Sequence, residues 1–213
     1  MIHLIDSAVS ERVTNCLSAW LERWGGLVLP VQRKIQVGES WVSRIMPVSC
    51  TVDPACDDDS KYQKVLPDSA YKSVGYLIQV GSAQTDFSGP RENLLTARYR
   101  LRLVVWLNYQ KMGIDDCNHA GAFELETIAN LRSRFQIISD EMSNPGDLVL
   151  SDFSIMPKEP GTVFAPFYMF EKPNIYTWPY GFFGLEFTAK AVVNTACLSP
   201  LGVANETACL TNW

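Results

Sequence analysis

Three arginines alternate along one apolar stretch of the chain: Arg98, Arg100 and Arg102 in RYRLRLVVWLNYQ. Side chains two residues apart lie on the same face of a β-strand, so an extended segment would present the three guanidinium groups as a row. A guanidinium binds carboxylates and phosphates through paired hydrogen bonds. The row therefore has three interpretations, which are cross-strand pairing with a carboxylate such as Glu186, a subunit interface, and contact with the DNA backbone.

A second candidate for chemistry is Cys117 with His119, two residues apart in DDCNH. A thiolate paired with an imidazole can act as a nucleophile, and both side chains are zinc ligands. The chain has only one other histidine, His3, and no second ligand pair at metal-site spacing. We therefore expect a turn and a helix cap here, and neither catalysis nor a bound metal or other cofactor.

Acidic side chains also occur in groups, but their spacing fits no binding motif. The run Asp57–Asp59 lacks the alternating ligands and the glycine turn of a calcium loop, so a solvated loop is expected. Glu124 and Glu126 lie on a predicted helix at a spacing that does not bring them together, which indicates a solvated surface. The chain contains no glycine-rich phosphate loop or dinucleotide fingerprint, which argues against nucleotide chemistry. We expect that the protein is not an enzyme.

An aromatic segment rich in proline runs from about residue 158 to residue 183. Its four prolines, from Pro160 to Pro179, exclude a helix or a central strand. It has three interpretations: a hydrophobic lid on its own chain, an arm that contacts another subunit, and a glycan- or receptor-binding platform that uses the loop 164–183, where Trp178 and Tyr180 alternate. If the interface interpretation holds for both this segment and the arginine row, the contact residues are Arg98, Arg100, Arg102, Phe167, Tyr168, Phe170, Tyr176 and Trp178.

The composition is that of a folded domain with an acidic surface. Apolar residues make up 47% of the 213 residues and charged residues 19%, which is ordinary for one globular domain. The net charge of −5 provides no general attraction to nucleic acid or to anionic membranes. The N-terminus lacks a secretion signal, no apolar run is long enough for a membrane helix, and the six scattered cysteines form no CxxC pair. We expect a soluble protein without membrane contact.

Two helices are predicted from apolar residues at helical spacing. The first covers Ser7–Trp24 and ends at Gly25-Gly26, which would provide the left-handed stop. The second covers about 120–142 and ends at Asn144-Pro145-Gly146. Its apolar stripe is Leu125, Ile128, Leu131, Phe135, Ile138 and Met142.

Strands are predicted from alternating apolar residues, at 73–80, 98–110, 148–157 and 180–194, with a short extended segment at 27–32. Residues 34–48 are ambiguous. The prediction is a single α+β domain over 1–213, a mainly antiparallel β-sheet flanked by two α-helices. Long insertions are expected at about 49–72 and 158–180, with an extended C-terminal tail from about 195.

This order of elements resembles that of the tail-terminator and head-to-tail connector proteins of tailed bacteriophages. The resemblance is carried by the Val13–Trp24 helix, RYRLRLVVWLNY, LETIANLRSRFQII, and the pair LVLSDFSIMP and YGFFGLEFTAKAVV. It implies a structural virion protein, assembled in the host bacterial cytoplasm, that forms a ring at the junction of head and tail. Its expected partners are copies of itself in a hexamer or dodecamer, neighbouring connector, portal or tail-tube proteins, and packaged DNA in a passing contact.

Overall fold

A single mixed sheet organises the chain in this computed structural model, which describes residues 2–37, 39–49, 65–86, 94–135, 148–167 and 173–194. The strands are β1 (Arg23–Val37), β2 (Ser40–Ser49), β3 (Ser73–Gln79), β4 (Gln84–Asp86), β5 (Leu94–Asn108), β6 (Leu148–Ile155) and β7 (Tyr180–Asn194). The helices are α1 (Ile2–Leu17), α3 (Cys117–Phe135) and α4 (Pro160–Val163), with 3-10 turns η1 (Gln110–Met112) and η2 (Pro173–Tyr176). The strand order is β2-β1-β3-β5-β7-β6, with β4 also beside β5. Only β1 and β3 run parallel, so the predicted α+β class with a mainly antiparallel sheet is confirmed.

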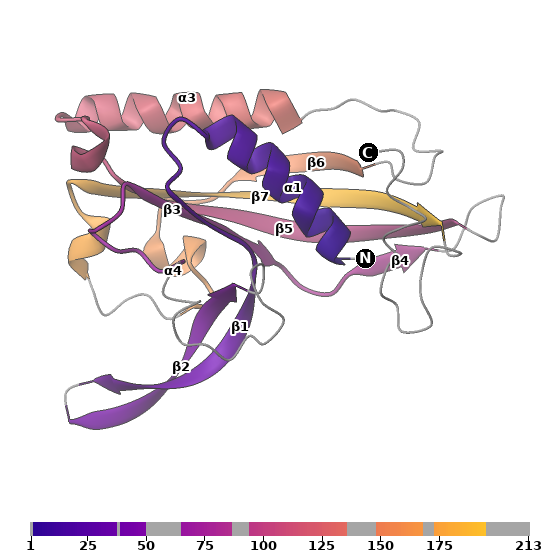
Figure 1. Cartoon of the computed structure of the whole chain (residues 1–213), viewed down its shortest axis with the longest axis horizontal. Coiled ribbons are helices and arrows are strands. Elements are labelled where there is room, and N and C mark those ends of the chain that lie inside the picture. The colour runs from indigo at the N-terminus through magenta and orange to yellow at the C-terminus, as the bar shows by residue number, and fades with distance from the viewer. Residues whose placement is uncertain are drawn as a thin grey trace.

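The centre of the sheet is the antiparallel pair of β5 and β7, joined from Leu94 opposite Asn194 to Asn108 opposite Tyr180. Odd-numbered β5 side chains from Tyr99 to Leu107 are buried, as is Tyr109 just after the strand, as the period of two predicted. They form the larger core together with the facing side chains of β7. Helices α1 and α3 cover this face of the sheet (Figure 1).

The opposite face of the same strands holds a second core. Even-numbered Val104 and Trp106 of β5 are buried there, beside Phe182 of β7. The segment around α4 covers them with Phe164 and Phe167. The middle of β5 is therefore buried on both faces, which the sequence indicated only for the odd-numbered side.

Strands β1 and β2 form a two-stranded ribbon that projects from the body of the molecule (Figure 1). We use "the ribbon" for the paired stretch Val28–Val37 with Ser40–Ser49. Before this stretch, β1 pairs in parallel with β3, from Arg23 opposite Val74 to Val28 opposite Ile78. The ambiguous region 34–48 is thus the tip and the second strand of an antiparallel hairpin.

The first helix is shorter at its C-terminal end than predicted, and this correction has a local cause. Helix α1 ends at Leu17, and β1 has begun at Arg23. The Ser73 hydroxyl donates to the Trp20 carbonyl and accepts from the Glu22 amide, which holds the connecting turn against β3. Trp20 and Trp24 both pack on the larger core. The spacing therefore indicated correctly that they are core residues, although Trp24 belongs to a strand.

The glycine pair predicted to end the helix lies inside β1. Gly26 has φ 60°, and the register of β1 on β3 shifts between Trp24 and Leu27. The Leu27 amide then donates to the Asp6 carboxylate of α1 over 2.8 Å. The glycines therefore make an irregularity that ties β1 to the first helix.

The buried stripe of α3 also differs from the predicted one. Glu124 and Thr127 are buried with Ile128 and Leu131, whereas Leu125 is exposed. The stripe predicted from apolar residues alone begins at Leu125, one residue too late, because the buried position there is occupied by Glu124 and its hydrogen-bond partners. The predicted solvation of Glu124 is wrong, and its partners are described below.

Several predicted features lie outside the described residues. These are most of the insertion at 49–72, the end of the second helix, the tail from about 195, and the acidic run at residues 57–59 that was predicted to be a solvated loop. Neither α1 nor α3, nor any other helix in the described part of the chain, combines the length and apolar character needed to cross a membrane.

The contact between Gly181 and Tyr109 provides a test of the packing. A Cβ at Gly181 would lie 2.1 Å from the Tyr109 hydroxyl oxygen, so Gly181→Ala should lower the free energy of unfolding by about 1–3 kcal/mol. Gly121→Ala on α3 is the matched control, because its added Cβ meets no atom within 4 Å apart from its chain neighbours and the backbone of its own helix. This control should be neutral or stabilising, since alanine favours helices. Urea unfolding of both variants measures the difference, and equal effects would contradict the packing described.

Candidate functional site

The arginine row lies on β5 as predicted, and its members have different surroundings. Arg100 and Arg102 both form ion pairs with Glu186 of β7, which confirms the cross-strand interpretation for these two residues. The Arg102 side chain is 12% exposed and that of Arg100 64%. Arg98 is exposed and stands opposite Lys190 on β7. Only the inner two arginines therefore meet a carboxylate across the strand pair.

Arg102 is the most extensively bonded member of the row. Its Nε and Nη2 donate to Glu186 Oε1 over 3.0 and 2.7 Å. Its Nη1 donates to the carbonyl oxygens of Thr162 and Ala165 over 3.1 and 2.7 Å. The guanidinium thus joins β5, β7 and the α4 segment. With these nitrogens already bonded, Arg102 is not placed to contact a DNA phosphate.

Glu186 is held in its charged form by this arrangement. Burial alone would raise the pKa of its carboxyl, but hydrogen bonds and positive charge from Arg102 and Arg100 outweigh burial and lower the pKa below its ordinary value. The carboxylate therefore stays ionised where the sheet face changes from polar to apolar. It neutralises one of the three positive charges of the arginine row on β5.

We predict that Arg102→Met destabilises the protein far more than Arg98→Met. The first change removes the four hydrogen bonds of Arg102 and leaves Glu186 buried with Arg100 alone, which should lower the free energy of unfolding by about 2–4 kcal/mol. The second alters an exposed side chain and should stay within about 0.5 kcal/mol. Chemical denaturation monitored by circular dichroism distinguishes them. Similar values for the two variants would show that the Arg102 contacts contribute little.

The aromatic segment packs against its own sheet over the part that the structure describes. Phe167 is buried in the second core, with its ring 6.1 Å from that of Tyr76. Tyr176 lies against Phe164 and Phe182 in the same cluster. This is the arrangement expected of a hydrophobic lid. Two further predicted interface residues, Tyr168 and Phe170, lie outside the described residues.

Trp178 and Tyr180, the pair considered for glycan stacking, each have one ring face covered. Trp178 stacks on Tyr109 with ring centroids 5.9 Å apart, and Tyr180 stacks on Trp106 at 5.2 Å. Trp178 nevertheless remains exposed. Buried Phe167 and the bonded Arg102 are packing residues of this chain, and the interface role of the row and the segment stays a prediction.

Cys117 and His119 lie at the start of α3, and their surroundings are those of a helix cap. The Asp116 carboxylate accepts a hydrogen bond from the Asn118 amide over 2.8 Å. That hydrogen bond is the main cause that lowers the pKa of Asp116. The predicted cap is confirmed, with Asp116 as the capping residue. Across the described ranges, no three His, Cys, Asp or Glu side chains gather as a metal site would require.

A polar cluster around the buried Glu124, which sequence reasoning missed, joins α3 to Tyr109 and to the exposed Lys158. Glu124 accepts a hydrogen bond from the Tyr109 hydroxyl, and the Lys158 Nζ lies 2.7 and 2.6 Å from its two carboxylate oxygens. Burial raises the pKa of Tyr109, and the hydrogen bond and charge of Glu124 raise it further. The tyrosine therefore remains a neutral donor. No local motif indicates this cluster, because Lys158 lies 34 residues after Glu124.

Two buried tyrosines provide a matched test of this cluster. Tyr109→Phe removes a donor from a buried carboxylate and should lower the free energy of unfolding by about 1.5–3 kcal/mol. Tyr76→Phe removes a buried hydroxyl that has no hydrogen-bond partner among the described residues, so it should be neutral or stabilising. Thermal and urea unfolding measure both changes. A larger loss for Tyr76→Phe would contradict the assigned bonding.

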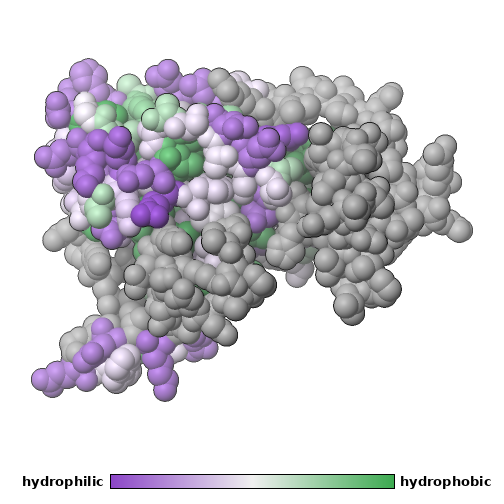
Figure 2. Space-filling view, in the orientation of Figure 1, coloured by the Kyte–Doolittle hydropathy of each residue, from purple (hydrophilic) through white to green (hydrophobic). Residues whose placement is uncertain are grey.

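Exposed apolar side chains mark two further surfaces that the sequence did not single out. The large exposed ones among the described residues are Leu29, Trp41, Ile45, Leu125, Ile155 and Trp178. The first three belong to the ribbon, whose outline stands off the body in Figure 2. Leu125 and Ile155 line a groove between α3 and β6, of about 370 Å³.

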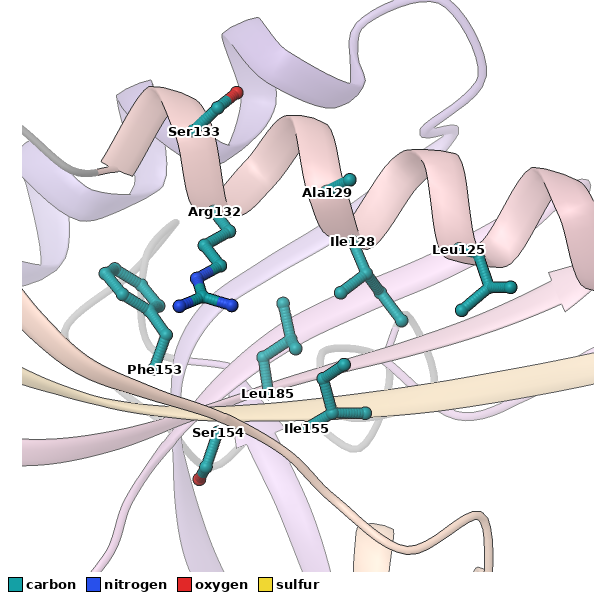
Figure 3. Close-up of a pocket in the computed structure, with 9 residues that line it drawn as sticks. All are labelled: Leu125, Ile128, Ala129, Arg132, Ser133, Phe153, Ser154, Ile155 and Leu185. Atoms are coloured by element: carbon teal, nitrogen blue, oxygen red, sulfur yellow. The ribbon is translucent and has the colours of Figure 1, made fainter.

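We call this second surface the edge groove. Its lining residues are Leu125, Ile128, Ala129, Arg132 and Ser133 of α3, Phe153, Ser154 and Ile155 of β6, and Leu185 of β7. Figure 3 shows the α3 side chains Ile128 and Arg132 directed toward the strands, and Phe153 beside the Arg132 guanidinium. The sequence predicts Leu125 in the core stripe of α3. Its exposure shows instead that it borders the groove, while Glu124 beside it is buried.

Neither protein-family models nor curated proteins provide a match for this chain.

Proposed function

We propose that this protein is a structural virion protein, one subunit of a ring at the head-tail junction of a tailed bacteriophage. It would serve as a tail terminator or a neck connector, without catalysis. The observation that carries the proposal is the ribbon, whose outer half pairs with no other strand in the described chain. A two-stranded ribbon is marginally stable in water by itself, so we expect a partner molecule to cover it.

The sheet is suited to contacts on two sides. Strand β2 forms one edge of the strand order and β6 forms the other. A closed ring of identical subunits needs two different surfaces on each subunit, one for each neighbour. Exposed apolar side chains occur at both edges, in the ribbon and in the edge groove. This distribution supports a ring more directly than it supports a single symmetric dimer contact.

The charges are compatible with a channel through which DNA passes. The chain carries a net charge of −5, and Glu186 pairs with the two inner arginines of the row. Phosphate contacts add up along DNA, so a surface with few unpaired cations binds it weakly. We therefore propose no more than a passing contact with packaged DNA. The other proposed partners are copies of the chain and the connector, portal or tail-tube proteins beside it in the virion.

Mass and particle shape test the proposal. The purified protein should form a hexamer or dodecamer of the 23.9 kDa chain and appear as closed rings by negative-stain electron microscopy. The mass can be measured by sedimentation velocity across a range of protein concentrations. The protein should also be present in purified phage particles, detectable by mass spectrometry. A monomer that joins no particle would contradict the proposed function.

A further inference from the structure

We infer that Trp41 and Ile45 in the ribbon of one copy insert into the edge groove of a neighbouring copy. This inference rests on the proposed function, because it names the contact by which the ring would close. The ribbon and the edge groove together hold five of the six large exposed apolar side chains among the described residues. Each surface would remove the apolar area of the other from water.

Two exposed apolar side chains of the ribbon, Trp41 and Ile45, share one face, whereas Leu29, opposite Val48, lies on the other. Trp41 and Ile45 are four residues apart on β2, so they lie on the same face of the strand. Trp41 is the most exposed of the large apolar side chains, at 68%. The Gln32 side chain, opposite Ile45, is occupied by a hydrogen bond to Ser43. Trp41 is thus exposed near a polar pair that is held in place by its own hydrogen bond. Tryptophan is one of the residues that contribute most to binding at protein interfaces.

The edge groove has the chemistry to accept an indole ring. Leu125 and Ile155 at its rim are 67% and 61% exposed, and Ile128 and Leu185 lie deeper. Arg132 points into it (Figure 3), and no carboxylate of the described chain forms an ion pair with its guanidinium. A guanidinium binds the face of a tryptophan more strongly than that of any other aromatic side chain. The groove therefore favours Trp41 over a purely aliphatic occupant.

The backbone of β6 favours a contact made by side chains over one made by pairing with a further strand. The register of β6 on β7 is irregular between Ser151 and Ser154, and Asp152 has φ 57°. A bulge of this kind interrupts the outer edge of a strand and disfavours the addition of another strand. A neighbour would meet this edge through the groove above it. Since the ribbon and the groove belong to opposite edges, the contact is head to tail, which is the type that closes into a ring.

Two variants of the full chain test the inference. The ribbon variant carries Trp41→Ser and Ile45→Ser, and the groove variant carries Leu125→Asp and Ile155→Asp. All four side chains are exposed, so both variants should fold, which circular dichroism and urea unfolding can verify. Each variant alone should lose self-association, and Trp41→Ser alone should weaken it about 30-fold, as for an interface hot spot.

Mixing the two variants isolates one contact. The groove variant retains an intact ribbon and the ribbon variant an intact groove, so an equimolar mixture should form a dimer of twice 23.9 kDa and no larger species. Sedimentation velocity measures this mass. Trp178→Ser is the comparison variant, because Trp178 is the sixth exposed apolar side chain and lies on neither surface. It should leave self-association unchanged.

The outcomes separate this inference from the proposed function. Folded variants that still assemble, or a mixture that stays monomeric, would overturn the docking while leaving a ring by another contact in place. Loss of assembly with Trp178→Ser but not with Trp41→Ser would assign the interface to the aromatic segment. An unaltered chain that is monomeric at every concentration tested overturns the docking of a second copy. If that monomer still joins phage particles, the proposed function stands.

Discussion

The burial of β5 on both faces between Leu103 and Leu107 is the constraint on which the rest of the structure depends. Odd-numbered side chains require a cover on one face, which α1 and α3 provide, and even-numbered ones require a cover on the other. The aromatic segment provides that second cover. Arg102 and Glu186 lie where the even-numbered face changes from charged to apolar, and their hydrogen bonds attach the cover to the sheet. Polar bonding and apolar packing thus hold the same segment.

Strand periodicity was the most informative signal in the sequence. Strand β7 runs from Tyr180 to Asn194 as predicted, and β3 ends within one residue of its prediction. Each of these strands has an apolar face whose surroundings stay the same along most of the strand. The alternation of apolar residues can therefore be recognised in the sequence before the fold is known. The pairing of the arginine row with Glu186 could also be predicted from the sequence, because opposite charges on two alternating strands stabilise each other across a strand pair.

The features that sequence reasoning missed depend on distant partners or on exposure. Glu124 is buried because Tyr109 and Lys158 satisfy it, and neither belongs to its own helix. Trp24 continues the apolar spacing of the first helix, yet it pairs with Gly75 as part of a strand. Trp41 and Leu125 carry no mark of exposure in the sequence, where an apolar residue is most simply assigned to a core. Only the arrangement of the sheet shows that they face outward.

One consequence of the ribbon concerns mechanical load. Its first strand is the continuation of the part of β1 that pairs with β3, so a single backbone runs from the tip into the sheet. A pull on the tip along this strand would be resisted by hydrogen bonds that lie across the direction of force. Such bonds are sheared together, whereas bonds peeled from one end break in succession. The strand that reaches outward is therefore anchored against tension along its own axis.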